Sequence, residues 1–181
     1  VECSRSVGGI LNFEDLATFE SQFEKPVSSS FMGHEVYGHS TWTQGPVLMQ
    51  TLNILESFDI QTMGHNSTRY IHTVVEALKL AMADRQAYYG DPDFTTVPID
   101  GLLSKEYAAE RAKLINFDRA YPELPAAGAP WRYSTVARTN DPASASRHRS
   151  DIQDTRGVSG TTHITVLDSD GNMVCATPSG G

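Results

Sequence analysis

Residues 158–168 read VSGTTHITVLD, and they place a Gly-Thr junction between a long polar segment and the clearest strand of the chain. The side chains of residues 161–167 alternate in two sets, which is the period of a β-strand. The turn-forming run Asp-Ser-Asp-Gly-Asn at 168–172 follows, and residues 173–177 return as a second strand. These patterns predict a β-hairpin that begins directly after the Gly-Thr junction.

Upstream of this hairpin the sequence predicts mostly helices, because apolar residues recur at steps of three and four in several segments. One of these helices is expected to place Leu48, Leu52 and Leu55 toward a core, with Thr51 and Ile54 beside them. The expected helices cover residues 12–22, 47–58, 66–89 and 104–114, and two short strands are expected within 26–37. The expected capping residues are Asn12, Asn66 or Ser67, and Ser104. The fold class is therefore α+β.

The acidic composition excludes some classes of partner. The 181 residues include 22 Asp and Glu residues against 14 Lys and Arg residues, whereas a phosphate-binding surface needs clustered positive charge. We therefore expect no nucleic-acid partner. No apolar run approaches the roughly 20 residues of a membrane-spanning helix, so no membrane span is expected in this chain. The first residue is not Met, which predicts a piece of a longer protein.

The sequence predicts no metal site and no cofactor. The run 168–172 has oxygen-bearing side chains at alternate positions, as a calcium loop does, but its glycine comes too early and no glutamate closes it. The six histidines form no pair at helical spacing and no cluster with cysteines. Cys3 and Cys175 lie far apart in the sequence and indicate neither a disulfide framework nor a compartment.

Four charged residues of the 66–89 helix invite a functional interpretation, but each has a simpler structural one. Glu76 and Lys79 are three residues apart, which is the ordinary spacing of an ion pair on one helix face. Asp84 and Arg85 are expected to anchor neighbouring loops. We therefore predict no catalytic role for these four residues.

The chain divides by composition into three parts. Residues 121–160 are rich in Pro, Gly, Ala and Ser and show no sustained period, which predicts a flexible linker. A linker of this length inside a compact domain is unusual, so a functional or processed segment is expected. The mostly helical part covers residues 1–120, and the strands lie in residues 161–181.

The Gly-Thr junction has a chemical meaning if the chain is cut there. A threonine hydroxyl is a weak nucleophile unless a base accepts its proton, and an N-terminal threonine carries that base as its own α-amine. The amine has a reference pKa of about 7.7–8.0, so it is available near neutral pH. Gly160 leaves room around the carbonyl that the Thr161 hydroxyl would attack to cleave its own chain. By itself this short motif is common and usually structural.

Longer segments make the interpretation specific. The sequence resembles the γ-glutamyltransferase (γ-glutamyltranspeptidase) family in five segments, which follow the family's order and spacing and cover most of the chain outside the linker. The segments are GGILNFEDLATF (8–19), VLMQTLNILESFDI (47–60), VEALKLAMADRQAYYGDPDF (75–94), GLLSKEYAAERAKLI (101–115) and GTTHITVLDSDGNMV (160–174).

The resemblance implies an N-terminal-nucleophile (Ntn) hydrolase that is made as one precursor and cuts itself into a large and a small subunit. The implied fold is an αββα sandwich. Residues 1–160 would form the C-terminal part of the large subunit, and residues 161–181 the first strands of the small one. Thr161 occupies the position of the family's nucleophile, and after cleavage its α-amine is the base.

The resemblance weakens after the hairpin and in the loop at 40–46. Transpeptidases of the family have a Thr-x-Thr-(Ile/Leu)-Asn pattern where this chain has Thr-Pro-Ser-Gly-Gly at 177–181. Thr177 and Ser179 are expected to supply supporting hydroxyls, but Gly181 has no side chain to replace the Asn that holds glutamyl groups. The family's substrate-binding arginine, serine pair and Gly-Gly oxyanion donors fall outside residues 1–181. The resemblance therefore implies acyl-transfer chemistry more firmly than γ-glutamyl specificity.

Two functions of different classes remain open. The first is a self-processing threonine amidohydrolase or acyltransferase that cleaves a γ-glutamyl or related amide through an acyl-enzyme and passes the acyl group to water or an amine. Its substrate would be a glutathione-like amide, or another acyl amide such as a cephalosporin side chain. The alternative is an unprocessed or non-catalytic relative, and the isolated 181-residue chain is itself expected to be inactive. A binding domain with an accidental Gly-Thr-Thr would require all five segment matches to be coincidental.

The resemblance also bears on partners and compartment. The implied macromolecular partner is internal, because the large and small subunits come from one precursor. Placement in the periplasm or secretion follows only from the family's habit, and the residues themselves leave the compartment unknown.

Overall fold

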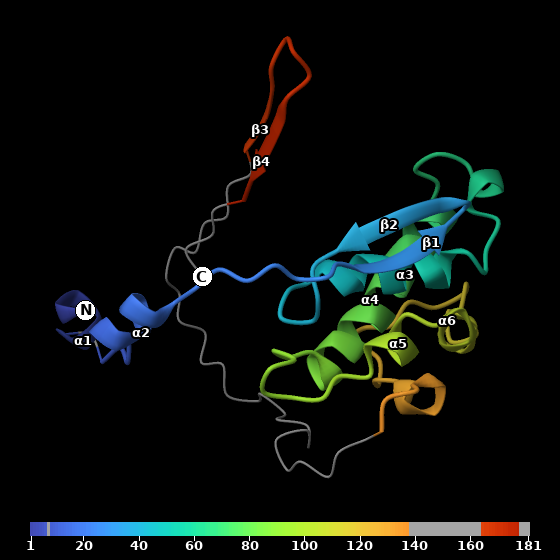
Figure 1. Cartoon of the computed structure of the whole chain (residues 1–181). Helices are drawn as coiled ribbons and strands as arrows, with labels where there is room; N and C mark the ends of the chain where they lie inside the picture. Colours follow the sequence, from blue (N-terminus) through green and yellow to red (C-terminus); the bar gives the residue numbers. More distant parts are fainter. Residues whose placement is uncertain (7, 138–163, 178–181) are drawn as a thin grey trace. The chain divides into compact units, whose positions relative to one another are not determined.

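The computed structural model describes residues 1–6, 8–137 and 164–177 (Figure 1). By its contacts the chain divides into two compact units, Val1–Arg147 and His148–Gly181. The first unit holds the helices and one hairpin, and the second holds the other hairpin. Gly160, Thr161 and Ser179 lie outside the described residues.

The elements predicted from the sequence appear in the expected order, together with short helices that were not predicted. The helices are α1 (Glu2–Ser6), α2 (Phe13–Thr18), α3 (Gly45–Leu55), α4 (Thr68–Tyr88), α5 (Ile99–Leu102) and α6 (Lys105–Ala112), with 3-10 turns η1 (Ile60–Met63) and η2 (Pro130–Tyr133). The strands are β1 (Val27–Phe31), β2 (His34–Gly38), β3 (Ile164–Leu167) and β4 (Met173–Ala176). The α+β class and all four predicted helices are confirmed, although α2 ends four residues before the predicted end at Gln22.

The predicted capping residues begin three of the helices. The Asn12 side chain accepts a hydrogen bond from the Asp15 amide at 3.0 Å, and the Asp15 carboxylate accepts one from the Asn12 amide at 2.8 Å, which is a capping box. Ser67 caps α4 and Ser104 caps α6, each by accepting a hydrogen bond from a backbone amide at 3.1 Å. These side chains supply partners for amides that the first helical turn leaves without one.

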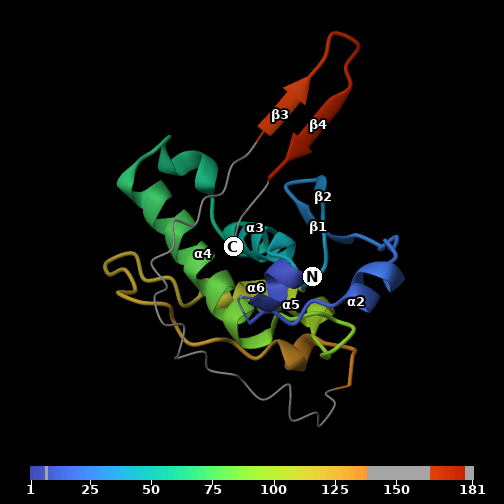
Figure 2. The same cartoon turned by 90° about the vertical axis from the view of Figure 1, so that its left-hand side faces the viewer.

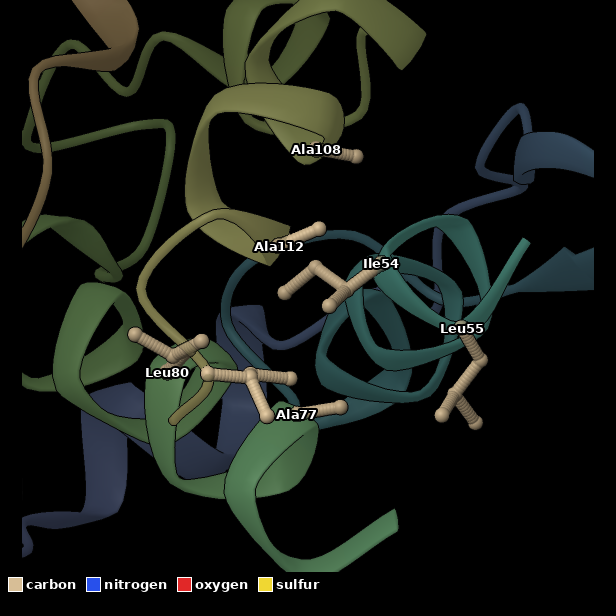
Figure 3. Packing of buried hydrophobic residues seen from close by; sticks show 7 residues of the cluster. Ile54, Leu55, Ala77, Leu80, Ala108 and Ala112 are labelled. Carbon is tan, nitrogen blue, oxygen red and sulfur yellow. The ribbon is translucent and has the colours of Figure 1, made fainter. Parts of the chain in front are cut away.

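The main core lies where α3, α4 and α6 pack against one another (Figures 2 and 3). Small alanines on α4 and α6 let the branched side chains of α3 and α4 approach closely. The buried residues of this core are Ile54, Leu55, Ala77, Leu80, Ala108, Ala112 and Ile115. Residues of α3, α4 and α6, together with Ile115, therefore share one hydrophobic core.

The predicted core-facing side of α3 was partly wrong. Leu48 is 56% exposed, whereas Met49 and Ile54 are each 1% exposed. The helix is turned so that Gln50 and Asn53, which are 2% exposed, also face inward and bind α4 and the loop before α6. Polar contacts therefore decide the orientation of α3 together with its apolar residues.

The hairpin of β1 and β2 has a tight turn at Met32 and Gly33, with φ of 49° and 84°. Two residues with positive φ give a turn whose twist matches that of the flanking strands. The Met32 amide donates a hydrogen bond to Glu56 Oε1 at 2.9 Å, which ties the turn to the end of α3. The two strands predicted within residues 26–37 are thereby confirmed.

The described part of the second unit, residues 164–177, holds the hairpin that the sequence predicts. Its strands pair antiparallel from Ile164 with Ala176 to Leu167 with Met173. Every residue of both strands is exposed within the chain, including large apolar side chains on both faces of the ribbon. Strands that are apolar on both faces are typical of sheets that are covered on both sides.

Candidate functional site

The predicted catalytic residues precede and follow the β3–β4 hairpin in the sequence. Gly160, Thr161 and Ser179 lie outside the described residues, so their roles stay predictions. Thr177 is described and follows directly after β4. The structure therefore describes the hairpin between Thr161 and Ser179 in the sequence, but it does not describe the predicted nucleophile Thr161 itself.

The turn of this hairpin is held by the side chain of Asp168. Its Oδ1 accepts hydrogen bonds from the amides of Asp170 at 2.9 Å and Asn172 at 2.8 Å. Its Oδ2 accepts one from the Asn172 side-chain amide at 2.8 Å. These bonds, first the one from the Asn172 side chain, lower the pKa of Asp168 below its usual value. The carboxylate therefore closes a turn, as the sequence predicts.

A second polar cluster lies inside the helical unit and is centred on Asp84, whose side chain is 0% exposed. Asp84 Oδ1 accepts a hydrogen bond from the Gly128 amide at 2.8 Å and lies 3.2 Å from Arg111 Nη2. Asp84 Oδ2 accepts hydrogen bonds from the Tyr107 hydroxyl at 2.7 Å and the Gln50 side chain at 3.3 Å. This one carboxylate therefore joins α3, α4, α6 and the segment around Gly128.

Arg111 is the buried counter-ion of Asp84 and is 4% exposed. Its Nη2 also donates hydrogen bonds to the carbonyl oxygens of Leu80 at 3.2 Å and Ala126 at 3.1 Å. Among the described residues its Nε has no hydrogen-bond acceptor. Burial raises the pKa of Asp84 above its usual value, although the charge of Arg111 opposes that shift.

Two tyrosines complete the cluster. Tyr107 donates to Asp84, and Tyr89 donates a hydrogen bond to Gln50 Oε1 at 2.6 Å. Burial, followed by the charge of Asp84, raises the pKa of both hydroxyls well above the usual value. Both hydroxyls therefore remain hydrogen-bond donors at neutral pH, which suits a structural role better than acid–base catalysis.

The predicted ion pair between Glu76 and Lys79 is confirmed, with 2.7 Å between Glu76 Oε1 and Lys79 Nζ. Glu76 is 1% exposed, and its Oε2 accepts a hydrogen bond from the Tyr121 amide at 3.0 Å. Burial opposes ionisation of Glu76, but Lys79 and the Tyr121 amide outweigh burial and lower the pKa. This pair therefore also attaches a distant segment of the chain.

The sequence predicted part of this arrangement. Asp84 anchors a neighbouring loop as expected, through the Gly128 amide. Its partners Tyr107 and Arg111 were not identified, although their spacing of four residues places them on one face of α6. No local pattern connects Asp84 with Gly128, because the two meet only when the segment after α6 folds back.

Comparison with known proteins supplies the family. The family model described as gamma-glutamyltranspeptidase matches residues 1–181, which is the whole chain. The chain belongs to the gamma-glutamyltranspeptidase family. The resemblance drawn from the five sequence segments is thereby confirmed.

The gamma-glutamyltranspeptidase relatives carry two kinds of name. The Acylase ACY 1 proenzyme of Pseudomonas sp. (strain SE83) is 35% identical and the glutathione hydrolase proenzyme of Escherichia coli (strain K12) is 34% identical, each over 94% of this chain. The chain spans only about a quarter of these relatives, 26% of each. The crystal structure of Helicobacter pylori gamma-glutamyltranspeptidase matches 72% of this chain and 38% of its own, with 33% identity and a TM-score of 0.64. The mixed helix-and-strand fold therefore resembles a solved member of the family.

The described residues 1–6, 8–137 and 164–177 show neither a membrane-spanning helix nor a metal cluster. No helix in these ranges is long and apolar enough to cross a membrane. The same ranges hold no group of three or more His, Cys, Asp or Glu side chains placed to bind a metal ion.

Proposed function

We propose that the protein containing this chain is a self-processing threonine amidohydrolase or acyltransferase. The observation that carries the proposal is the family match across residues 160–181, in which Gly-Thr-Thr stands just before the β3–β4 hairpin in the sequence. Both curated relatives are named proenzymes, which supports a precursor that is cut. The proposed cut separates Gly160 from Thr161 and yields a large and a small subunit.

The cut uses the same hydroxyl that later attacks substrate. The Thr161 hydroxyl attacks the Gly160 carbonyl, and the peptide bond is replaced by an ester. Water then hydrolyses the ester, which leaves a carboxylate on Gly160 and a free α-amine on Thr161. The reaction is intramolecular, so no second protein is required.

In turnover, the free α-amine of Thr161 accepts the proton of its own hydroxyl. The oxygen attacks the amide carbonyl of the substrate, and backbone N–H groups stabilise the oxyanion. The proton passes to the departing amine, which leaves an acyl-enzyme ester on Thr161. Water or a second amine then takes the acyl group and regenerates the hydroxyl.

The sequence positions of the hydroxyl residues support a role for Ser179 in this site. The described ladder ends with Ile164 opposite Ala176. Thr161 comes three residues before Ile164 in the sequence, and Ser179 comes three residues after Ala176. We propose that Thr177 and Ser179 supply the hydroxyls that support the nucleophile.

The apolar faces of the hairpin support the αββα sandwich. Ile164 and Val166 are 51% and 55% exposed on one face, and Leu167 and Met173 are 63% and 69% exposed on the other. We place this ribbon inside a sheet that the rest of the family fold covers on both sides. The helices of residues 1–120 would belong to the large subunit.

The substrate class is a γ-glutamyl amide or a related acyl amide. Relatives named glutathione hydrolase and acylase are equally similar to this chain, so identity alone does not separate them. Gly181 stands where the family's transpeptidases have a glutamyl-binding Asn. That difference supports a substrate whose acyl part lacks the charged groups of glutamate.

The proposal is tested on the full-length precursor with Thr161→Ala and the neighbouring control Thr162→Ala. Intact masses are followed during incubation, and hydrolysis of γ-glutamyl and other acyl amides is measured on the same samples. We expect the parent and Thr162→Ala to give a fragment that begins at residue 161, and Thr161→Ala to stay whole and inactive.

A precursor that folds but remains one chain would support the alternative, a non-catalytic relative. Gly181 in place of the family's Asn is the observation that favours this alternative. Cleavage that persists in Thr161→Ala would contradict the assigned nucleophile.

A further inference from the structure

Residues 27–120 are named here the helical body. Residues 121–136, named here the strap, follow this body in the sequence and are attached to it by carboxylates of α4 and α5. Glu76 accepts the Tyr121 amide at 3.0 Å, Asp84 accepts the Gly128 amide at 2.8 Å, and Asp100 accepts the Thr135 amide at 2.7 Å. Three acidic side chains on α4 and α5 therefore bind backbone amides of the strap at intervals of seven residues. This segment is the first part of the predicted linker, yet it lies on the body.

The strap is also held through its carbonyl groups. Lys79 donates to the Tyr121 carbonyl at 2.5 Å, and Arg111 donates to the Ala126 carbonyl at 3.1 Å. The Tyr88 hydroxyl donates to the Gly128 carbonyl at 2.6 Å. At Tyr121 and Gly128 both backbone polar groups are thus bound, which replaces the pairing that a sheet or helix would give them.

The fit between strap and body is close at two glycines. A Cβ atom on Gly128 would lie 2.1 Å from the Tyr107 hydroxyl, and one on Gly101 would lie 2.2 Å from the Pro130 carbonyl oxygen. Pro130 itself is less than 2% exposed. The strap therefore occupies a fitted position in which neither side tolerates a larger residue.

Asp100 is the last anchor before residue 138. It accepts hydrogen bonds from the Ser134 hydroxyl at 2.5 Å and from the Thr135 hydroxyl at 2.6 Å, in addition to the Thr135 amide. Burial opposes its ionisation, but these bonds prevail and lower its pKa to about 2. Asp100 is therefore a charged acceptor at neutral pH, and charge-assisted hydrogen bonds are about twice as strong as neutral ones.

We propose that the strap is the permanent anchor of the large subunit's C-terminal end, so that residues up to 136 stay bound to the body after the chain is cut. That the strap stays bound after the cut rests on the proposed cleavage at Gly160–Thr161. The anchoring itself rests only on the contacts between residues 121–136 and the body.

The strap is not expected to accelerate the cut. Loss of the Asp100 anchor would move the last fixed point from Thr135 back to Gly128, which lengthens the chain before Thr161 by seven residues. Loop closure depends on length only weakly, and this change alters its probability by about 1.4-fold. A positioning role would require a much larger effect on the cleavage rate.

Limited trypsin digestion of the full-length protein tests the anchor at Arg132. This residue is exposed within the strap, and Arg138, Arg147, Arg149 and Arg156 in the rest of the predicted linker serve as references. We compare the parent with Asp100→Asn and with the control Asp118→Asn, which makes the same chemical change just before the strap. Mass spectrometry gives the rate of cutting after each arginine.

We expect the parent and Asp118→Asn to be cut after the four reference arginines while the bond after Arg132 resists. In Asp100→Asn the bond after Arg132 should be cut at least tenfold faster. Cutting after Arg85, within α4, reports global unfolding and should not change. Equal cutting after Arg132 in the parent and Asp100→Asn would overturn the anchor.

Ser134→Ala is the second variant, because it removes one donor to Asp100 without touching the body. A smaller acceleration at Arg132, about threefold, is expected, and none would contradict the proposal. The self-cleavage rate of Asp100→Asn should stay within about twofold of the parent, and a tenfold loss would mean that the strap positions the junction. If the parent never cleaves, the proposed function fails, while the trypsin result still decides whether the strap is an anchor.

Discussion

The helical body and the β3–β4 hairpin use the same residue types in opposite ways. In the body, apolar side chains fill a common core, and charged groups such as Asp84 and Glu76 are buried with partners. In the hairpin, every strand residue is exposed within this chain, and apolar side chains cover both faces. The body is therefore built mainly from its own contacts, whereas the apolar faces of the hairpin are not covered by any described residue of this chain.

The two regions therefore depend on different contacts for their stability. The body can hold its shape through contacts that are local to it, including the strap. The hairpin would contribute the nucleophile strand, and its order is expected to depend on burial between other layers. Substitutions in the body should therefore change the free energy of unfolding through contacts within this chain. Substitutions in the hairpin should change it only in the full-length protein.

The strongest test of the body is Asp84→Ala. It would leave the buried Arg111 charge without its counter-ion, and losing one partner of a buried pair costs about 3–5 kcal/mol. We expect the free energy of unfolding, measured with denaturant on the full-length protein, to fall by that amount. The double variant Asp84→Leu with Arg111→Met should recover only the part of the loss that comes from the unpaired charge, because the Gly128 amide and the Tyr107 hydroxyl still lack their acceptor. A loss below about 1 kcal/mol for Asp84→Ala would show that the body does not depend on this cluster.

Leu167→Ala tests whether the hairpin is buried in the full-length protein. In the full-length protein Leu167 is expected to be buried by another layer, so its truncation should cost about 2–5 kcal/mol. In the 181-residue chain Leu167 is 63% exposed, and the change should stay within about 0.5 kcal/mol. The measurement is the denaturant midpoint of both proteins. Equal effects in both would contradict the proposed burial of the hairpin.

Acid titration tests whether the Asp100 anchor behaves as a charged contact. Its folded pKa of about 2 lies below the value of about 3.9 for an unfolded aspartate. The stabilisation is therefore complete above pH 4 and is lost as the pH falls toward 2. We expect the Tm difference between the parent and Asp100→Asn to be largest above pH 5 and to vanish near pH 2. A difference independent of pH would mean that the charge of Asp100 contributes nothing.

The sequence predicted the elements more completely than their connections. Periodicity and capping residues placed α4 and α6, and alternation placed both hairpins, because these signals are local. The attachment of the strap leaves no periodic pattern in the sequence, because its backbone pairs with side chains of the body. The orientation of α3 was missed for a related reason, since Gln50 and Asn53 are buried by specific partners.

For the site, the sequence contributed the Gly-Thr-Thr motif and the resemblance to the family, and the structure contributed the hairpin of residues 164–176. Arg111 and Tyr107 were not identified, because their role depends on a carboxylate more than twenty residues earlier in the sequence. Long-range polar contacts of this kind carry no spacing rule.

The smallest expected effect concerns the two hairpin turns. The β3–β4 turn places Gly171 at a positive φ of 85°, whereas the β1–β2 turn places Met32 at a positive φ of 49°. A non-glycine residue pays a steric cost in this region, and asparagine tolerates it better than methionine does. Met32 is 50% exposed, so its replacement removes little packing. We therefore expect Met32→Asn to stabilise the body by about 0.5–1 kcal/mol.

The gain from Met32→Gly should be smaller than that from Met32→Asn, because glycine also increases the entropy of the unfolded chain. Glu35→Asn is the matched control, since it introduces the same residue at an exposed strand position of the same hairpin. Denaturant unfolding of the three variants separates turn strain from residue type. If Met32→Asn destabilises the protein, the contact between the Met32 amide and Glu56 depends on the methionine, and the two turns differ in more than their strain.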